Sequence, residues 1–295
     1  MARHVFAAIV TGHGTAANNR GLTEGNITTL QKIVWNGEVR TTVSAESIRF
    51  ALRRRLAESG EDCNRVFDEE GRVNTWRDPE FKRWEAKSKT APPIDDDLLG
   101  FMSAQAAEQE GTRGTARFRR AVLELTRAVS LTPWPGDVTF NAASPGATPS
   151  AQKKGMNPVP YGTELHATRY QYGIAMTPAR LRVPGRAAIA LEALCALGEV
   201  AGNQGRFLYD FSPDAVIFRI TDDPAPRILY AFALEDGRLR VPEIVRKVKA
   251  GDIATGELVL GGAIDEHDRK ALESVAQYHE GVRAACRAAC ARMAA

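Results

Sequence analysis

The organisation of this 295-residue chain centres on the stretch NNRGLTEGNITTLQKIVWNGEVRTTVSAESIRFALRRRL, residues 18–56. Its first nine residues form a polar loop in which Leu22 is the single apolar side chain, so this loop cannot belong to a hydrophobic core. Two alternating segments follow, over 28–35 and 38–43. Because Asn36-Gly37 is a strong two-residue turn signal, they predict a β-hairpin.

The last part of the stretch predicts a helix over residues 44–58. Ser44 is a good N-cap residue, and Glu46 in the first turn suits the helix dipole. Ile48, Leu52 and Leu56 recur every four residues and predict one buried stripe. The free backbone N–H groups at the start of such a helix are a natural seat for an anion.

Arginines gather on the same predicted helix. Arg49 and Arg53 form a second stripe beside the apolar one, and Arg54 and Arg55 extend the positive charge. Arginines on an exposed helix face are ordinarily only solvated. Here the amide-rich loop just before the helix favours a surface that holds a phosphate backbone.

Composition indicates an ordinary globular protein. Apolar residues make up 44% and charged residues 25% of the chain. No run of about 18 apolar residues is present, and the N-terminus shows no cleavage pattern, so we expect a cytoplasmic protein without a membrane span. The four cysteines, at positions 63, 195, 286 and 290, are too scattered for a disulfide framework or a zinc site.

The charge is unevenly distributed along the chain. The whole chain carries +3, whereas residues 60–113 hold eight basic and thirteen acidic side chains, a net −5, which leaves +8 for the remainder. A basic body with an acidic insertion favours a polyanionic partner for the body.

Two long excursions interrupt the predicted body. Residues 60–95 form a polar insertion with Trp76, Phe81 and Trp84 as isolated aromatics. Asp95-Asp96-Asp97, at its return, suggests a metal site, but consecutive helix residues point in different directions, so we expect capping and solvation. Residues 133–163 are rich in proline and predict a long loop or hairpin.

The C-terminal half predicts further alternating elements. We expect a strand over 161–176, an apolar helix over 185–201 with Gly202 as its C-cap, and a glycine-rich turn over 202–209 that can approach a phosphodiester. Strands are predicted over 215–220 and near 227–233 and 253–261. The remainder predicts one helix from about 265 to 293, broken near Gly281.

Four of these segments together resemble the CRISPR-associated autoregulator (DevR) family. They are NNRGLTEGN at 18–26, VSAESIR at 43–49, DLLGFM at 97–102 and GNQGR at 202–206, in the order expected of the family. The resemblance implies the repeated backbone subunit of type I Cascade complexes. It implies an α+β fold with an RRM-like (ferredoxin-like) palm, to which it assigns residues 1–59, 114–136 and 169–295. Residues 60–113 would be a finger insertion and residues 137–168 a thumb hairpin.

The resemblance also implies a function and a set of partners. Copies polymerise into a helical filament along CRISPR RNA and hold its phosphates, while the thumb displaces one base at regular intervals and the other bases pair with a target DNA strand. The other partners would be the Cascade subunits that cap the 5′ handle, process the RNA and form the large subunit; no cofactor is implied. Matching segments assign RNA contacts to Asn18, Asn19, Arg20, Asn26, Ser44, Arg49, Arg53, Lys153, Lys154, Met156, Asn203, Gln204 and Arg206.

Two other functions are alternatives to this one. A metal-dependent, type III-like ribonuclease would need an aspartate in the loop over 12–27, where Glu24 is the only acid. The Asp95–Asp97 cluster is the other possible metal site. A transcriptional regulator would need a helix-turn-helix pattern, and none is visible. Among the histidines, His13 and His166 could stack on a base, although ordinary surface histidines are commoner.

Overall fold

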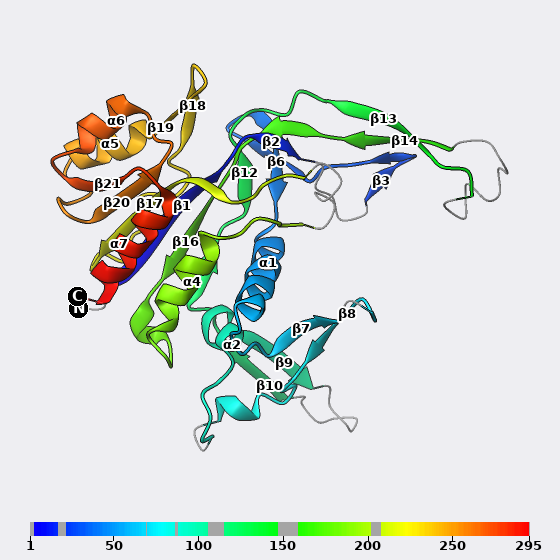
Figure 1. Ribbon diagram of the computed structural model, residues 1–295, viewed down its shortest axis with the longest axis horizontal. Helices are drawn as coiled ribbons and strands as arrows, with labels where there is room; N and C mark the ends of the chain where they lie inside the picture. Colours follow the sequence, from blue (N-terminus) through cyan, green and yellow to red (C-terminus); the bar gives the residue numbers. More distant parts are fainter. Residues whose placement is uncertain are drawn as a thin grey trace.

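The computed structural model describes residues 3–16, 22–68, 70–85, 88–105, 115–146, 159–201 and 208–294. Its centre is a nine-stranded sheet, mostly antiparallel, that runs diagonally through the molecule (Figure 1). The strand order is β21 (Ala276–His279), β20 (Leu258–Gly262), β17 (Pro213–Thr221), β1 (His4–Thr11), β16 (Tyr170–Met176), β12 (Ala128–Ser130), β6 (Glu38–Val43) and β5 (Lys32–Trp35), with β11 (Leu123–Leu125) also paired to β16.

Strand β1 lies in the middle of this sheet, and both of its faces are buried. In the ladder, Ala7 lies opposite Ile174 of β16 and Phe218 of β17. Val5, Ala7 and Ile9 face one hydrophobic cluster, whereas Phe6, Ala8 and Val10 face another. A strand buried on both faces is apolar throughout instead of alternating, which explains the sequence VFAAIV.

Helices cover both faces of the sheet. One face packs against α1 (Ala45–Glu58), α4 (Arg186–Leu194) and α7 (Val282–Ala294), and α2 (Ile94–Leu99) continues this layer. The other face is covered by α5 (Pro242–Lys249), α6 (Glu266–Leu272) and the hairpin β18–β19 (Ala233–Glu235 and Arg238–Arg240). Near the two ends of the described chain, Arg3 Nη1 donates to the carbonyl of Arg292 at 2.9 Å.

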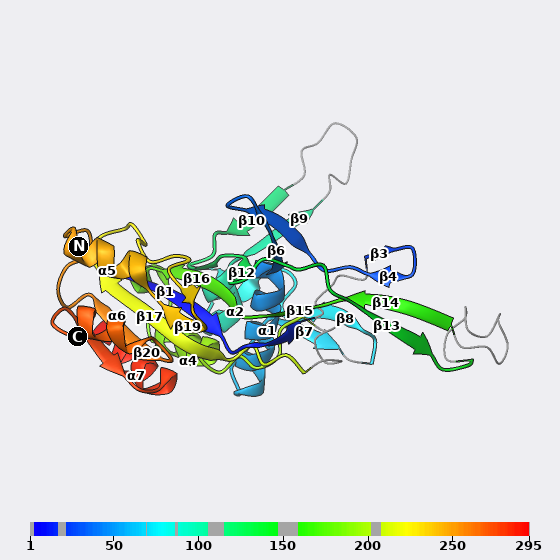
Figure 2. The same ribbon diagram turned by 90° about the horizontal axis from the view of Figure 1, so that it is seen from above.

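A long arm projects from one end of the sheet (Figure 2). It consists of the antiparallel pair β13 (Val138–Ala143) and β14 (Val159–Glu164), and the short strands β4 (Ile27–Thr28) and β3 (Thr23–Glu24) complete its sheet. At the base of the arm, β15 (His166–Thr168) pairs with β2 (Gly14–Ala16). Strands from either side of residues 17–21 therefore pair with strands that follow residue 158, in two separate small sheets.

A second module lies below α1 in Figure 1. It contains the hairpin β7–β8 (Arg65–Asp68 and Val73–Trp76), the 3-10 turn η1 (Lys82–Trp84) and the ribbon β9–β10 (Phe101–Gln105 and Thr115–Arg119). Contrary to the sequence-based prediction, its aromatics are not isolated. Phe81 stacks on Phe101 with ring centroids 3.9 Å apart, and Trp76 and Trp84 contact this pair edge-on. Because Phe101 lies far along the sequence from the other three rings, no local pattern could reveal their cluster.

The three aspartates of α2 are buried, so the prediction that they are solvated is wrong. Asp95 accepts hydrogen bonds from the backbone N–H groups of Asn64 at 2.7 Å and Arg65 at 3.0 Å. Asp96 accepts one from Asn64 Nδ2 at 2.9 Å. Asp97 receives four donors, from Arg119, Arg186 and the backbone at Arg182 and Val183. These carboxylates fasten the lower module to the helical layer.

The N-terminal elements confirm the local signals. Ser44 caps α1 by accepting a hydrogen bond from the Ser47 N–H at 3.2 Å. Asn36 and Gly37 both adopt positive φ angles, of 51° and 82°, as a type I′ turn requires.

The C-terminal prediction was partly wrong. The segment predicted as one helix over 265–293 contains α6, the strand β21 and α7, and α5 was not predicted. Helix α4 ends at Leu194, with Cys195 as its C-cap, well before the predicted Gly202. Strand β21 forms the edge of the main sheet and pairs in parallel with β20, a pairing that its own sequence does not predict.

No helix of the described residues is long and apolar enough to cross a membrane.

His166 is buried, not a surface histidine. Its Nδ1 lies 2.7 Å from Thr41 Oγ1 and its Nε2 lies 3.1 Å from Thr132 Oγ1. Tyr170 also contacts Thr41 through its hydroxyl, at 2.8 Å. Burial lowers the pKa of His166 to about 4, so the ring is neutral and connects the base of the arm to the main sheet.

Asp96 gives the fold a testable pH dependence. Burial, followed by the neighbouring charge of Asp95, raises the pKa of Asp96 to about 7. The unfolded chain loses this proton near pH 4, so between pH 4 and 7 the folded state holds a proton that the unfolded state lacks, and stability falls as the pH rises. We expect Asp96→Asn to be more stable than the wild type by about 2 kcal/mol at pH 8, and the advantage to vanish near pH 4. Urea unfolding at both pH values measures this; an equal difference at both would contradict it.

Candidate nucleic-acid interface

The described residues that flank the early loop and the glycine-rich turn meet at one end of the main sheet. Tyr209, just after residues 202–207, places its hydroxyl 2.6 Å from Thr11 Oγ1 and 3.1 Å from the carbonyl oxygen of Gly12. Its ring lies against Gly14, where a Cβ atom would approach it to 3.2 Å. The described flanks of the early loop and of the glycine-rich turn therefore touch each other, and β15 of the arm pairs with β2 in the same place.

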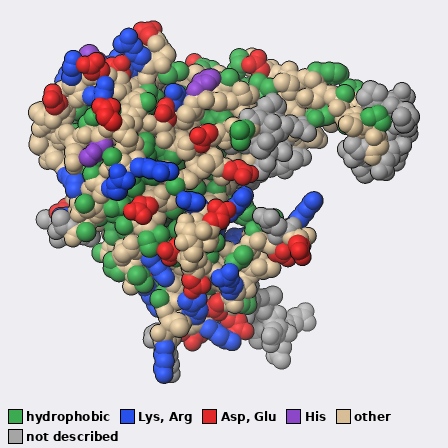
Figure 3. All heavy atoms as spheres, in the orientation of Figure 1, with side chains coloured by type: hydrophobic (Ala, Val, Ile, Leu, Met, Phe, Trp, Pro, Cys, Tyr) green, Lys and Arg blue, Asp and Glu red, His purple; other side chains and the backbone are tan. Residues whose placement is uncertain are grey.

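Helix α1 begins beside this junction and forms the floor of an adjoining groove. Its solvent-facing stripe consists of Ser47, Phe50, Arg54 and Glu58. Hollows of about 320, 440 and 190 Å³ lie along this stripe and share its residues. One wall is the segment 196–201, and the other is the hairpin β7–β8. We call this feature the α1 groove; in Figure 3 the molecule is hollowed between the arm and the lower module.

The described candidate residues lie mainly inside the protein. Ser44 is buried and occupied in capping α1. Arg49 donates from Nη2 to the carbonyl of Leu99, and Arg53 forms an ion pair with Asp95, with Nε 3.6 Å from Oδ2. Burial lowers the pKa of both arginines, which nevertheless stay charged at neutral pH. The structure gives these residues structural contacts, and their contact with RNA stays a prediction.

Asn26 lies at the surface of the arm. Its Nδ2 donates to the carbonyl of Pro160 at 3.1 Å, which ties β4 to β14. The remaining candidates lie outside the described residues: Asn18, Asn19, Arg20, Lys153, Lys154, Met156, Asn203, Gln204 and Arg206.

Sequence reasoning did not name Phe50, and it named Arg54 only as extra positive charge, although both line the α1 groove beside the predicted candidate Arg53. Phe50 and Arg54 lie one position beyond Arg49 and Arg53, on the side opposite the buried stripe. The helical spacing contains this signal, because positions 47, 50, 54 and 58 share the face opposite Ile48 and Leu52. The aromatic wall that Phe67 contributes from β7 could not be found this way, because its position depends on tertiary packing.

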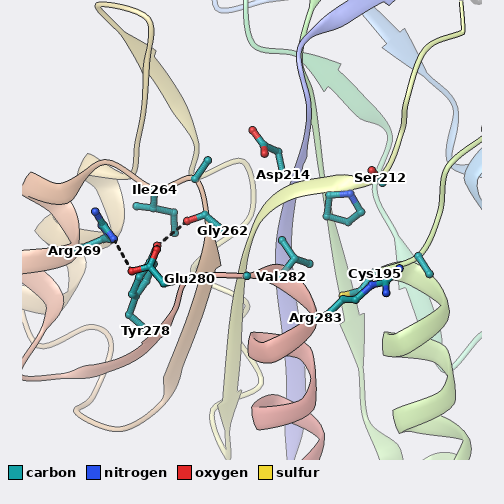
Figure 4. Close-up of a pocket in the computed structure, with 14 residues that line it drawn as sticks. Cys195, Ser212, Asp214, Gly262, Ile264, Arg269, Tyr278, Glu280, Val282 and Arg283 are labelled. Carbon is teal, nitrogen blue, oxygen red and sulfur yellow. Dashed lines mark hydrogen bonds and ion pairs between the residues drawn. The ribbon is translucent and has the colours of Figure 1, made fainter.

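A larger hollow, of about 710 Å³, lies at the other end of the molecule, between β17, β20 and the start of α7 (Figure 4). Its charges are balanced and largely paired. Arg269 contacts Glu280 at 3.4 Å, and the Tyr278 hydroxyl donates to the carbonyl of Gly262 at 2.9 Å. Asp214, on its rim, pairs with Arg169. Such a lining does not favour a polyanion.

Within the described ranges, no group of three His, Cys, Asp or Glu side chains is arranged to hold a metal ion. All four cysteines are free thiols. Burial raises the pKa of Cys63 to about 12, which makes it an inert core residue.

Comparison with known sequences places this geometry in context. Residues 6–248 match the family model described as CRISPR-associated negative auto-regulator DevR/Csa2. The chain is 66% identical over 299 residues to a protein of Myxococcus xanthus (strain DK1622) named CRISPR-associated protein Cas7/Cst2/DevR, and the match covers 99% of this chain and 98% of the relative.

Two solved structures share the fold. A chain of a CRISPR RNA-guided surveillance complex matches with a TM-score of 0.59 and 17% identity, covering 98% of this chain and 99% of that chain. A chain of such a complex in a pre-nicking state matches with a TM-score of 0.61 and 16% identity, with the same coverage. At this identity the likeness concerns the mixed α+β fold.

The two faces of α1 predict that substitutions of the neighbouring residues Arg53 and Arg54 lower the free energy of unfolding by different amounts. Arg53→Ala leaves the buried Asp95 carboxylate without its ion-pair partner, so we expect the free energy of unfolding to fall by about 2 kcal/mol. Arg54→Ala removes an exposed side chain that pairs with Glu58 and Glu199, and should change it by less than about 0.5 kcal/mol. Urea denaturation of both variants checks this, and equal losses would refute the assignment of inner and outer faces.

Proposed function

Because the chain belongs to the CRISPR-associated DevR family, we propose that it is a backbone subunit of a type I surveillance complex in the cytoplasm. Copies of it would polymerise along CRISPR RNA and hold the strand for pairing with target DNA. The observation that supports this most strongly is that the described flanks of the early loop and of the glycine-rich turn meet the base of the arm and the start of α1 at one end of the sheet.

The order of the elements supports an RRM-like palm. Strands β17, β1, β16 and β12 lie side by side in that order, with α1 between β1 and β12 in sequence and α4 between β16 and β17. When these four strands are numbered by their order in the sequence, their order in the sheet is 4-1-3-2, and both helices pack on the same face. The arm formed by β13 and β14 would be the thumb, and the module within 60–113 the fingers.

The α1 groove is the proposed path of the RNA backbone. Arg54 lies on its floor, and the flanks of residues 17–21 and 202–207 lie at its upper end. Arg20, Asn203, Gln204 and Arg206 would add donors from these loops. Contacts to phosphates do not distinguish sequences, as a subunit that accepts any spacer requires.

Specificity would come from base pairing and not from the protein. A strand held by its phosphates leaves its base edges available to a target DNA strand. Lys153, Lys154 and Met156 would act from the thumb, with the lysines on phosphate and the methionine against a displaced base. The remaining Cascade subunits, which cap the 5′ handle, process the RNA and contribute the large subunit, would bind the ends and one side of the filament.

We assign the subunit no catalytic role. The loop over 12–27 contains Glu24 as its only acid, and Glu24 lies exposed on β3. Asp95 and Asp97 of α2 accept hydrogen bonds from the protein's own backbone and arginines, and Asp96 accepts one from the Asn64 side chain. These contacts argue against an Asp95–Asp97 metal centre and against the ribonuclease alternative.

Electron microscopy of the protein purified with co-expressed CRISPR RNA tests this function. We expect a helical filament whose length follows the length of the RNA, because the strand templates the assembly. Nuclease treatment should shorten the filaments. Discrete particles of constant size, unaffected by nuclease, would refute the proposal.

Charge reversal at the thumb makes a separate prediction. The double variant Lys153→Glu, Lys154→Glu should bind RNA more weakly by a similar factor for every spacer sequence, because the lost contacts are to phosphate. Dissociation constants for several unrelated single-stranded RNAs at one salt concentration measure this. The control variant Arg283→Glu, on the exposed start of α7 at the far hollow, should bind normally. A defect confined to particular spacers would contradict a grip on phosphates alone.

A further inference from the structure

We propose that the hollow between α1 and the hairpin β7–β8 is a pocket for one nucleobase of the bound strand. This inference rests on the proposed function and specifies a ligand group for one part of the α1 groove. The hollow has a volume of about 440 Å³, within the usual range of small-ligand sites. Its lining is Phe50, Arg53, Arg54, Ala57, Glu58, Arg65, Val66, Phe67 and Asn74.

Two aromatic rings form the apolar part of this pocket. Phe50 of α1 and Phe67 of β7 meet edge to face, with centroids 5.6 Å apart and ring planes at 83°. Both remain partly open, with Phe50 39% and Phe67 42% exposed. Two partly uncovered aromatic rings in a concave site are a stacking surface for any base, because every base has a π-face.

Polar groups lie next to these rings on the same face of the hairpin. Asn74 is directly opposite Phe67 in the β7–β8 ladder, and Arg65 is opposite Trp76. Paired residues of an antiparallel hairpin share a face, so the Asn74 carboxamide lies beside the Phe67 ring. Among the described residues this carboxamide has no hydrogen-bond partner. A base stacked on Phe67 would bring its polar edge to this amide, which can both donate and accept.

Arg65 lines the pocket and lies against an aromatic ring of the hairpin. Its guanidinium lies over the Trp76 ring, 5.3 Å from the centroid, and its Nε is enclosed without an acceptor in the described part of the chain. Trp76 in turn packs on Phe81 at 5.4 Å, so this wall is anchored in the aromatic cluster of the lower module. A pocket wall that is already ordered loses little entropy when a ligand binds.

The position of the pocket favours a base over a protein side chain. It shares Phe50 and Arg54 with the neighbouring hollow of the groove, so a strand whose phosphates follow α1 passes its mouth. Aromatic faces next to a carboxamide and a guanidinium are the groups that contact unstacked bases. The base would be one that is turned away from its neighbours, and the shape of the site requires no particular base.

The first test compares a single-stranded RNA with a fully abasic ribose-phosphate strand of the same length. We expect the wild-type protein to bind the base-containing strand more tightly than the abasic strand. The ratio of the two dissociation constants should be about tenfold smaller in Phe67→Leu. Leucine preserves the apolar bulk and removes the π-face, and Phe67→Trp should retain the full preference. Phe118→Leu, on the exposed ribbon β9–β10, is the matched control and should behave as the wild type.

Photo-cross-linking gives an independent second test. RNA that contains 4-thiouridine should cross-link to the tryptic peptides 50–53 and 66–72, which hold Phe50 and Phe67, and Phe67→Leu should abolish the second cross-link. Cross-links elsewhere but none in these peptides would overturn the pocket while leaving the proposed function intact. A change in the protein's self-association in Phe67→Leu without RNA would also overturn it, by identifying a second copy as the occupant. The absence of any RNA binding by the wild type would refute the proposed function itself.

Discussion

The buried carboxylate of Asp97 joins the lower module to the body of the protein. Asp97 contacts Arg119 of β10 at 3.1 Å and Arg186 of α4 at 3.0 Å, and it accepts the backbone N–H groups of Arg182 and Val183. It thereby joins segments that come from three parts of the chain. A buried charge is tolerated only when it is paired and hydrogen-bonded in this way, and removing one partner typically costs 3–5 kcal/mol. The geometry of the α1 groove depends on this contact, because one of the groove's walls belongs to the module that Asp97 fastens.

Helix α1 serves both sides of this arrangement. Its inner arginines, Arg49 and Arg53, contact the α2 region, and its outer residues Phe50 and Arg54 line the groove. The buried contacts of the inner arginines fix the position of α1, and they thereby also fix the position of the groove floor on its outer face. A strand that is bound without regard to its sequence needs such a fixed path, since no base-edge contact restores the register once it is lost.

The sequence predicted those features that depend on neighbouring residues. The Asn36-Gly37 turn, the Ser44 cap and the apolar stripe of α1 follow from local chemistry, and all three are present. It failed where distant segments meet. From the sequence alone, the aspartates at 95–97 resemble a solvated helix cap, because their hydrogen-bond donors come from the distant segments 64–65 and 182–186. Likewise, β21 is a strand because it pairs with β20, which its own sequence does not indicate. The candidate site shows the same division. The sequence predicted the helix that carries the arginines, and that helix is present, but an arginine beside a buried stripe is exposed or enclosed according to what packs against it.

The described groove is only weakly basic, and this has a consequence for how it would hold RNA. Its lining contains four arginines, at positions 53, 54, 55 and 65, and three glutamates, at 46, 58 and 199. Most of the cationic side chains that contact the RNA phosphates would therefore lie outside the groove. The loops that contain Arg20, Lys153, Lys154 and Arg206 would supply them. Charge on the loops would supply the salt-dependent part of the affinity, through release of counterions. The aromatic pocket would supply a part that salt hardly changes, because stacking involves no counterion. The two contributions act on different parts of the nucleotide, the phosphate and the base. Because the cationic loops and the aromatic pocket are different parts of the protein, the subunit can hold the RNA backbone tightly and still leave most bases free to pair.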